Sequence, residues 1–333
     1  MRFGIFSDDN RRILCCASML LILACGCVRD VPHENPYDPL SANPITGTAL
    51  QGRVVMKNQP GVGVPGALVS LLPSRRAAIT DTAGYFSFPE AETGSTALAI
   101  EKKGFDADTL AIPPGTGQAR SFTIELNALP VVSAVRITMR KIDQWWPNPI
   151  YTASISAAAD DANGVSDIDS LWVEVDTLRF GMAYSVSAKN FQSAIVPSDL
   201  PSNSLEWLIG KPCTVRARDK GGALGVSAPA YATRIIENEA QPVFPALQDT
   251  VSASPEFTWT PPPGEFPFTY TITVVRLDAG TQTVVWTRAG LGSYLRMFQY
   301  PSVLPAGLYF WTIAIVDEFG NMAQSKESSF IVQ

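Results

Sequence analysis

Four aspartates each stand three residues before a glycine, and their carboxylates are the first groups in this sequence to test for chemistry. The segments read DTAG from Asp81, DANG from Asp161, DKGG from Asp219 and DEFG from Asp317. Carboxylates serve as metal ligands, as general acids and bases, or only as turn residues. Type I turns favour Asp at the first position and Gly at the fourth. We therefore interpret the four segments first as turns between strands.

The segment DDANGVSDID, which begins at Asp160, is the main candidate for a metal site. Its acidic residues are Asp160, Asp161, Asp167 and Asp169. An EF-hand loop with Gly164 at position 6 would have Ala159 at position 1 and Ser170 at position 12, so two essential ligands are missing. We favour a solvated acidic turn, because calcium needs six or more converging oxygens. We expect no cofactor; a structural calcium ion on these aspartates, near a domain junction, is the alternative.

Other catalytic groups are scarce in the sequence. The single histidine, His33, lies in a proline-rich segment, away from any strand. A Ser–His or Cys–His pair needs a histidine beside the nucleophile, and the zinc, P-loop and nucleophile-elbow motifs are absent. We predict that the chain is not an enzyme. A hydrolase that uses two carboxylates in a cleft is the third functional hypothesis.

Adjacent tryptophans form the main aromatic candidate for binding. Trp145 and Trp146 would point to opposite faces of a strand, so one could join the core while the other is exposed or packs on a neighbouring domain. Their functional interpretation is a stacking platform for a sugar or a partner protein. We favour a contact between domains, because tryptophan buries a large area wherever it can. Trp172, on the polar face of its strand, raises the same question.

The composition indicates which secondary-structure elements carry the candidate aspartates and tryptophans. The chain has 333 residues, enough for two or three domains. Hydrophobic residues make up 46% and charged residues 17%, as in folded proteins. The net charge of −6 gives no basic surface for nucleic acid. The 26 prolines and 24 glycines are scattered, which is typical of many short strands joined by turns. We predict an all-β fold.

The N-terminus carries a targeting segment. Arg11 and Arg12 precede an apolar run from Ile13 to Ala24. This run is shorter than the roughly 20 residues that span a bilayer, and it ends in small residues, as secretory signals do. Its end, LILACGC, resembles a bacterial lipoprotein signal, in which an invariant cysteine receives the lipid. We prefer Cys25, which has an aliphatic residue three positions before it; Cys27 is the alternative.

The resemblance to lipoproteins has consequences for location. It implies membrane attachment through the N-terminal lipid, which is durable when two or three acyl chains are present. The residue directly after each cysteine is Gly26 or Val28, and not Asp. In well-studied Gram-negative lipoproteins such an Asp retains the protein at the inner membrane, so the resemblance implies the bacterial outer membrane, facing the periplasm or the cell surface. We expect no structural disulfide, since Cys213 is the only cysteine beyond residue 27.

Periodicity divides the remainder into strand-rich domains. Alternating apolar residues in ALVSLLP, GYFSF, LWVEV and FTYTITVVRL each predict a strand with one buried face. We predict three tandem β-sandwich domains after the signal and a Pro-rich tether. The predicted segments are 1–24 (signal peptide), 25–47 (flexible tether), 48–129, 130–237 and 238–333 (β-sandwiches).

Each domain resembles a known family. The first, in LQGRV, GVGVPGALVSLLP, TDTAGYFSF and GSTALAIEKKGF, resembles the carboxypeptidase regulatory-like family, a transthyretin-like β-sandwich without catalytic residues; Thr96 stands where the family usually has Tyr. The second loosely resembles bacterial immunoglobulin-like repeats. The third, in SPEFTWTPPPG and LPAGLYFWTIAIVDEFGNMAQS, resembles fibronectin type III-like domains, which implies a core role for Trp259 and a corner role for Tyr309.

Together these features predict a membrane-anchored, non-catalytic lipoprotein that acts in binding, adhesion or scaffolding at the cell envelope. Its expected partners are the membrane and a protein or carbohydrate ligand, and not nucleic acid. A carbohydrate-binding accessory lipoprotein that uses Trp145, Trp146 or Trp172 is the alternative.

Overall fold

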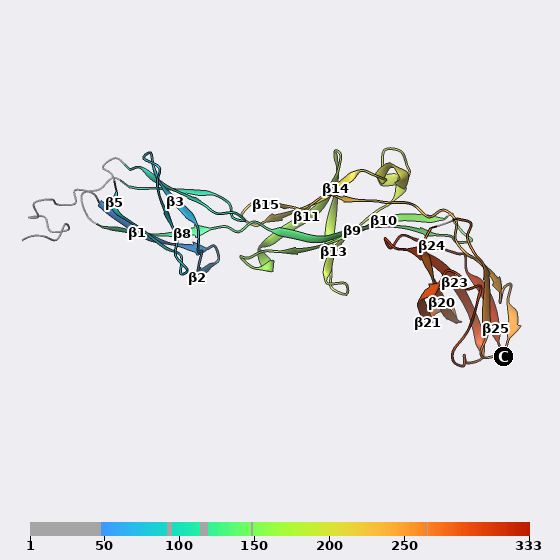
Figure 1. The fold of residues 1–333 in the computed structure, drawn as a ribbon. Helices are drawn as coiled ribbons and strands as arrows, with labels where there is room; N and C mark the ends of the chain where they lie inside the picture. Colours follow the sequence, from blue (N-terminus) through green and yellow to red (C-terminus); the bar gives the residue numbers. More distant parts are fainter. Residues whose placement is uncertain (1–47, 92–94, 114–118, 148, 265) are drawn as a thin grey trace, which may run out of the picture. The chain divides into compact units, whose positions relative to one another are not determined.

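The structure is a computed structural model, and it describes residues 48–91, 95–113, 119–147, 149–264 and 266–333 (Figure 1). The predicted signal peptide and tether, with Cys25 and Cys27, lie outside the described residues. Among those that are described, no helix has the length and apolar character needed to cross a membrane. The fold is all-β, as predicted: strands dominate, and the helical elements in the described ranges are three short 3-10 helices.

Contacts divide the chain into two compact units. Among the described residues, the first contains Thr48 to Val54, with Pro65–Ile100 and Thr109–Ile124, and the second contains Val55–Val64, Glu101–Asp108 and Glu125–Gln333. The bounds of the three domains predicted from the sequence remain a prediction.

The N-terminal strands form two sheets of four strands. One sheet has the order β2-β1-β5, with β8 also on β1, and the other has the order β4-β3-β6-β7. The strands are β1 (Thr48–Met56), β2 (Gln59–Gly63), β3 (Leu68–Leu72), β4 (Arg76–Ile79), β5 (Tyr85–Ala91), β6 (Ala97–Glu101), β7 (Asp108–Ala111) and β8 (Arg120–Leu126). The period-two prediction is confirmed, since Val69 and Leu71 of β3 are fully buried while Ser70 between them is not.

One glycine of the first unit has a clear steric role. A Cβ added at Gly52 would lie 2.6 Å from the carbonyl oxygen of Phe122 and 2.7 Å from the Phe86 ring. Neighbouring strands approach β1 too closely there for any side chain. The glycine that supports the resemblance to the regulatory-like family therefore has a local packing reason.

The second unit contains one long hydrogen-bonded sheet. Its strand order is β15-β14-β11-β12-β13-β10-β9-β24-β23-β20-β21, with β16 on β14 and β25 on both β18 and β23. A separate three-stranded sheet has the order β17-β19-β22. The strands up to residue 231 are β9 (Val131–Ile142), β10 (Ile150–Asp160), β11 (Ile168–Val175), β12 (Leu178–Ser185), β13 (Asn190–Ile195), β14 (Pro212–Asp219), β15 (Leu224–Val226) and β16 (Ala230–Tyr231). The 3-10 helices are η1 (Val165–Asp167), η2 (Pro197–Asp199) and η3 (Leu205–Leu208).

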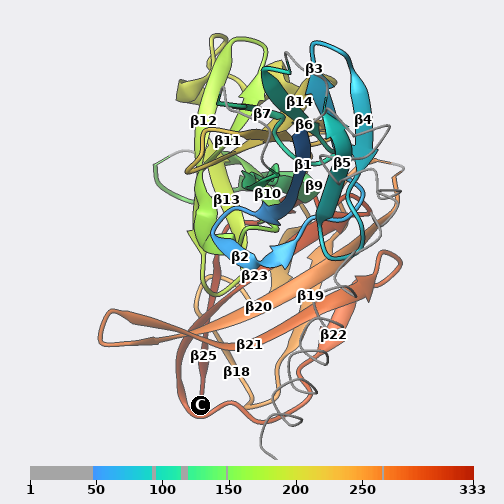
Figure 2. The ribbon, with the colours of Figure 1, turned by 90° about the vertical axis from the view of Figure 1, so that its left-hand side faces the viewer.

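Strand β12 connects two layers of this unit. Its first half pairs with β11, as Leu178 does with Val175, and its second half pairs with β13, as Ser185 does with Asn190 (Figure 2). The layer β11-β14 and the layer β9-β10-β13 enclose one hydrophobic core, to which Val173, Val215 and Ile155 contribute. As predicted, Val173 is buried and its neighbour Trp172 is directed to the other face.

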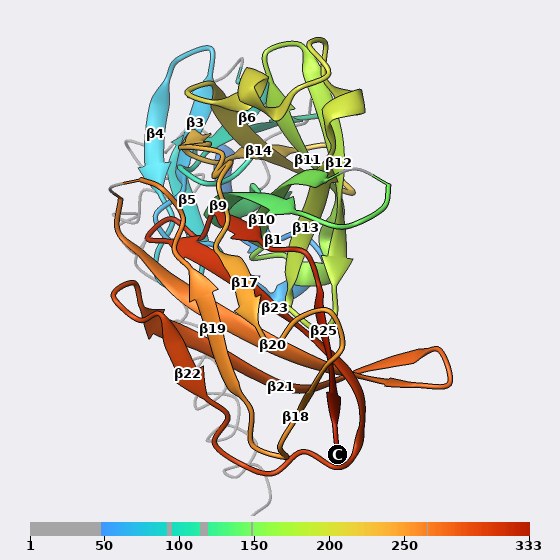
Figure 3. The same cartoon turned by 90° about the vertical axis from the view of Figure 1, so that its right-hand side faces the viewer.

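A second core lies between the three-stranded sheet and the C-terminal part of the long sheet (Figure 3). The strands here are β17 (Gln241–Phe244), β18 (Asp249–Val251), β19 (Glu256–Thr260), β20 (Phe268–Asp278), β21 (Thr281–Gly292), β22 (Met297–Gln299), β23 (Gly307–Asp317), β24 (Met322–Gln324) and β25 (Ser328–Val332). Trp259 and Trp311 are both buried in this core, which confirms their predicted role. Strand β24 also pairs in parallel with β9, so the two cores share one sheet.

Candidate metal centre

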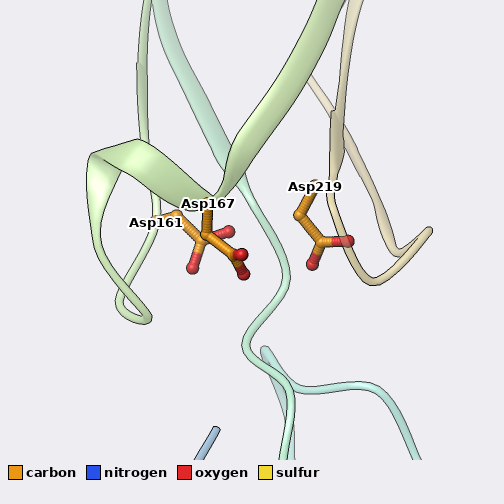
Figure 4. A group of neighbouring side chains, drawn as sticks. All are labelled: Asp161, Asp167 and Asp219. Carbon is orange, nitrogen blue, oxygen red and sulfur yellow. The ribbon is translucent and has the colours of Figure 1, made fainter. Parts of the chain in front are cut away.

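Three buried aspartates converge in the second unit. Ligand oxygens of Asp161, Asp167 and Asp219 all lie within 4.8 Å of one another. The three residues are only 4%, 6% and 2% exposed. Figure 4 shows that Asp161 and Asp167 approach from one loop and Asp219 from a separate turn. In the described part of the chain, this is the one group of three or more His, Cys, Asp or Glu residues whose ligand atoms lie this close together.

The ends of neighbouring elements position the three carboxylates. Asp161 directly follows β10, Asp167 ends η1, and Asp219 ends β14. Strands β11 and β14 pair with Ile168 opposite Asp219, which places Asp167 and Asp219 at the same end of the pair. The amide of Lys220 donates to the carbonyl oxygen of Asp167 at 2.8 Å, so the two loops are joined directly.

Two of these aspartates also form the turns predicted from the sequence. Asp161 Oδ1 accepts from the amide of Asn163 at 2.8 Å, and Asp219 Oδ1 accepts from the amide of Ala223 at 2.8 Å. Gly222, which follows Asp219 in its turn, has a φ of 92°, a conformation that glycine adopts without strain. The turn prediction is confirmed, but it uses only one oxygen of each carboxylate.

The remaining oxygens of the cluster are poorly satisfied. Asp161 Oδ2 and Asp167 Oδ2 are buried and have no hydrogen-bond partner in the described part of the chain, and the same is true of Asn127 Oδ1. The amide group of Asn127 donates to Asp219 Oδ2 at 2.6 Å, and that of Asn58 donates to Asp167 Oδ1 at 3.4 Å. Buried polar atoms without partners are rare in folded proteins and each needs a reason.

The three carboxylates of the cluster also lack a cationic ion-pair partner among the described residues. Among the described residues, no Lys or Arg nitrogen lies within the 4.0 Å ion-pair distance of Asp161, Asp167 or Asp219. Two carboxylates at this separation repel by on the order of 3 kcal/mol at an effective dielectric constant of about 20. Burial, with the charges of Asp167 and Asp219, raises the pKa of Asp161 above its ordinary value, against the hydrogen bond from Asn163.

The set of aspartates given from the sequence as the alternative calcium ligands is therefore corrected in part. Asp160 and Asp169 are exposed and lie outside the cluster, and Asp169 pairs with Arg218 at 3.4 Å instead. Asp219 was interpreted from the sequence only as a turn residue, yet its second oxygen faces the cluster. Asp219 could have been identified as a candidate ligand from the pairing of β11 with β14, because that pairing brings the ends that carry Asp167 and Asp219 together.

The adjacent tryptophans do not lie on a strand. Trp145 and Trp146 are in the loop between β9 and β10 and are 69% and 85% exposed. The expectation that one of them can join the core is therefore wrong, because the strand ends before them. Trp145 donates from Nε1 to the carbonyl oxygen of Glu327 at 3.0 Å, and the ammonium of Lys326 lies 4.8 Å from its ring centroid. Trp146 presents its indole to solvent.

Trp145 also lines a pocket of about 390 Å³ with Leu247 and Lys326, among other residues. Trp172 differs, because its ring is half-buried and its Nε1 donates to Glu174 at 3.1 Å. The guanidinium groups of Arg179 and Arg218 lie 5.8 and 6.0 Å from its ring centroid. The indole of Trp172 is thus already engaged by its own strand neighbours.

No protein-family model matches this chain, and no curated protein does. Solved structures that it resembles include a DUF3823 family protein from Bacteroides ovatus, at 10% identity and a TM-score of 0.25, over 55% of this chain and 97% of that one. The fibronectin(III)-like modules of CbhA from Clostridium thermocellum match at 12% identity and a TM-score of 0.29, over 61% and 93%.

Chicken CNTN1 domains FN1–FN3 match at 10% identity and a TM-score of 0.34, over 81% of this chain and 92% of that one. At such TM-scores the likeness extends no further than an all-β arrangement, which the sheets of this chain establish directly. The resemblance of residues 48–129 to the regulatory-like family remains a prediction.

Proposed function

We propose that this chain is a lipid-anchored, non-catalytic protein of the bacterial outer membrane that acts in binding, adhesion or scaffolding. The observation that carries the proposal is the apolar run that ends in Leu23, Ala24 and Cys25, followed by a proline-rich segment and then by strands. A lipid anchor and a spacer suit a protein that presents rigid β-domains to a partner. Loops and exposed strand edges supply the contact surface.

The arrangement of the carboxylates gives no support to the hydrolase hypothesis. A glycosidase needs two carboxyl groups about 5–10 Å apart in a cleft that admits the substrate. The three aspartates brought together here are almost fully buried, and none of them lines the described pockets of about 590, 450 and 390 Å³.

The anchor is tested on the protein isolated from its cells. Mass spectrometry of the mature N-terminal peptide should find diacylglyceryl-modified Cys25, and Cys25→Ala should leave an unlipidated protein. Cys27→Ala is the matched control and should not alter the modification. A wild-type peptide in which both cysteines are unmodified contradicts the proposal. Protease treatment of intact cells then distinguishes the cell surface from the periplasm.

Carbohydrate binding is the second candidate function, and the exposure of Trp146 favours it. An exposed indole offers a flat apolar face on which a sugar ring can stack. Affinity electrophoresis in gels that contain soluble polysaccharides should show retardation that Trp146→Ala removes. Tyr294→Ala, which also removes an exposed ring, should leave the retardation unchanged. Equal migration of all variants in every gel excludes this function for the polysaccharides used.

A further inference from the structure

We propose that Asp161, Asp167 and Asp219 bind a calcium ion, with the side-chain amides of Asn58 and Asn127 completing the site. The inference concerns the second unit by itself and does not depend on the lipid anchor or on the ligand of the protein.

The oxygens that are not used in turns supply the right number of ligands. After Asp161 Oδ1 and Asp219 Oδ1 are assigned to backbone amides, the two oxygens of Asp167 and one each from Asp161 and Asp219 remain. Asn58 and Asn127 both have their amide groups against these carboxylates. The oxygen and nitrogen of an amide exchange places by a simple rotation. With both rotated, the four carboxylate oxygens and the two amide oxygens make six possible ligands, which meets the lower limit for calcium.

The unpartnered atoms are the second, independent reason for a cation. Asp161 Oδ2 and Asp167 Oδ2 are buried and have no hydrogen-bond partner among the described residues. Both atoms are acceptors, so another acceptor cannot satisfy them, and a cation between them satisfies both. The two aspartates are more than nine-tenths buried, and bulk water therefore does not replace the missing partner.

The same unit contains a comparable turn that is neutralised in a different way. Asp317 accepts from the amides of Phe319 and Asn321 through Oδ1, as Asp219 accepts from its own turn. Its Oδ2 lies 3.2 Å from Nε of Arg234 and also accepts from the Asn321 side chain. A buried carboxylate in this fold thus receives a cationic partner where the chain provides one. Asp219 has no such arginine in the described part of the chain, and two further carboxylates lie beside it. A divalent cation is the partner that suits three negative charges.

The ligand chemistry selects calcium from the common metals. The donors are carboxylate and amide oxygens, with no nitrogen or sulfur ligand, which disfavours zinc and copper. Magnesium holds several of its waters and demands octahedral geometry, whereas calcium accepts an irregular set of protein oxygens. A nearly closed site made only of protein oxygens therefore suits calcium better.

Lys57 offers the competing explanation. An ideal Cβ at Gly221 would lie 2.6 Å from Lys57 Nζ and 3.2 Å from Asp219 Oδ1, so the ammonium is near the cluster without forming an ion pair. One monovalent ammonium at the edge can neutralise one carboxylate, but not three. A Lys57 variant separates the two explanations.

The test uses the full chain, purified in detergent after treatment with a chelator. Calcium chloride is titrated up to about 10 mM, which covers the range of extracellular calcium modules, and binding is followed by calorimetry and by the midpoint of thermal unfolding. We expect one calcium ion per chain, an unfolding midpoint that rises with calcium, and a weaker response to magnesium. Absence of binding together with a midpoint that chelators do not change overturns the proposal.

Asp167→Asn is the decisive variant, because among the described residues the only hydrogen bond to its carboxylate is the long one from Asn58. It should bind calcium at least tenfold more weakly, while its calcium-free unfolding midpoint is no lower than that of the wild type. Asp169→Asn, an exposed neighbour in sequence, is the matched control and should bind as the wild type does. Lys57→Met should bind calcium at least as tightly as the wild type. Undiminished affinity in Asp167→Asn, or lost affinity in Lys57→Met, contradicts the assignment; if Asp167→Asn does not fold, the wild-type titration and Lys57→Met still decide.

Discussion

At the scale of single residues, Arg234 illustrates how this protein handles buried charge. The side chain of Asp317 has no exposed surface, and the guanidinium of Arg234 is its counter-charge. The same guanidinium lies 5.2 and 5.3 Å from the ring centroids of Phe266 and Phe319 and pairs with the more exposed Glu318. Removing one partner of a buried pair is far more damaging than removing one partner at the surface.

Arg234→Met should therefore lower the free energy of unfolding by about 2–4 kcal/mol, since it leaves the Asp317 carboxylate buried without a cation. Arg179→Met is the control, because Arg179 is largely exposed in its pair with Glu174, and it should change stability by less than about 1 kcal/mol. Urea unfolding of both variants measures the difference. Equal losses in the two variants would mean that Arg234 contributes no more than a surface charge.

Cys213 gives a second prediction at this scale. Its side chain is part of the core, and burial, with the nearby charge of Asp176, raises its pKa to about 11. At pH 8 the thiol of the folded protein is protonated, and only the thiolate reacts. The peptide that contains Cys213 should stay unmodified by iodoacetamide in the native protein and be labelled in urea. Rapid labelling of the native protein, followed by mass spectrometry of this peptide, would contradict the prediction.

At the scale of elements, two tyrosines of adjacent strands share one core but differ in their hydrogen bonds. Tyr309 on β23 donates to the carbonyl oxygen of Pro305 at 2.8 Å, as its resemblance to a corner tyrosine implies. This bond fastens the start of β23 to the chain that enters it. Tyr270 on β20 is also fully buried, but its hydroxyl has no hydrogen-bond partner among the residues that the structure describes.

The two positions should respond differently to the same change. Tyr309→Phe should lower stability by about 1 kcal/mol, because a hydrogen bond is lost while the ring remains. Tyr270→Phe should be neutral or stabilising, since it removes a buried hydroxyl that has no partner. Thermal unfolding of both variants at matched concentrations tests the pair. A larger loss for Tyr270→Phe than for Tyr309→Phe would show that Tyr270 has a partner in solution.

At the scale of the whole molecule, acid is expected to weaken the second unit through a buried ion pair. Lys141 on β9 contacts Glu239, in the segment before β17, at 2.9 Å, and Gln241 donates to the same carboxylate at 2.7 Å. Burial acts to raise the pKa of Glu239, but the hydrogen bonds and the charge of Lys141 outweigh it and lower that pKa below its ordinary value of 4.5.

A carboxyl group with a lowered pKa in the folded state stabilises the protein above its unfolded pKa, and the contribution is lost as the pH falls through the folded pKa. The free energy of unfolding should therefore decrease as the pH falls below about 4.5. Glu239→Gln should make this decrease less steep, and it should lower stability at neutral pH because Lys141 loses its counter-charge. Identical pH profiles for the variant and the wild type would exclude the pair as a source of acid sensitivity.

The sequence by itself determined the all-β class, the faces of strands such as the one around Val173, and the Asp-to-Gly turns. It also assigned Trp259 and Trp311 to the core. These features depend on the alternation of side chains along a strand and on the backbone preferences of a few consecutive residues. Local sequence patterns therefore predict them. The lipid anchor, the domain bounds and the ligand are predictions from the sequence that await their experiments.

Only the tertiary structure decided which aspartates meet. Asp219 joins Asp161 and Asp167 because β14 pairs with β11 in one register, and Asn58 and Asn127 come to the same place from remote parts of the chain. Strand pairing between distant segments sets such a cluster, and no local pattern encodes it. For the same reason the sequence placed Asp160 and Asp169 in a candidate site, whereas in the structure both are exposed and lie outside the cluster.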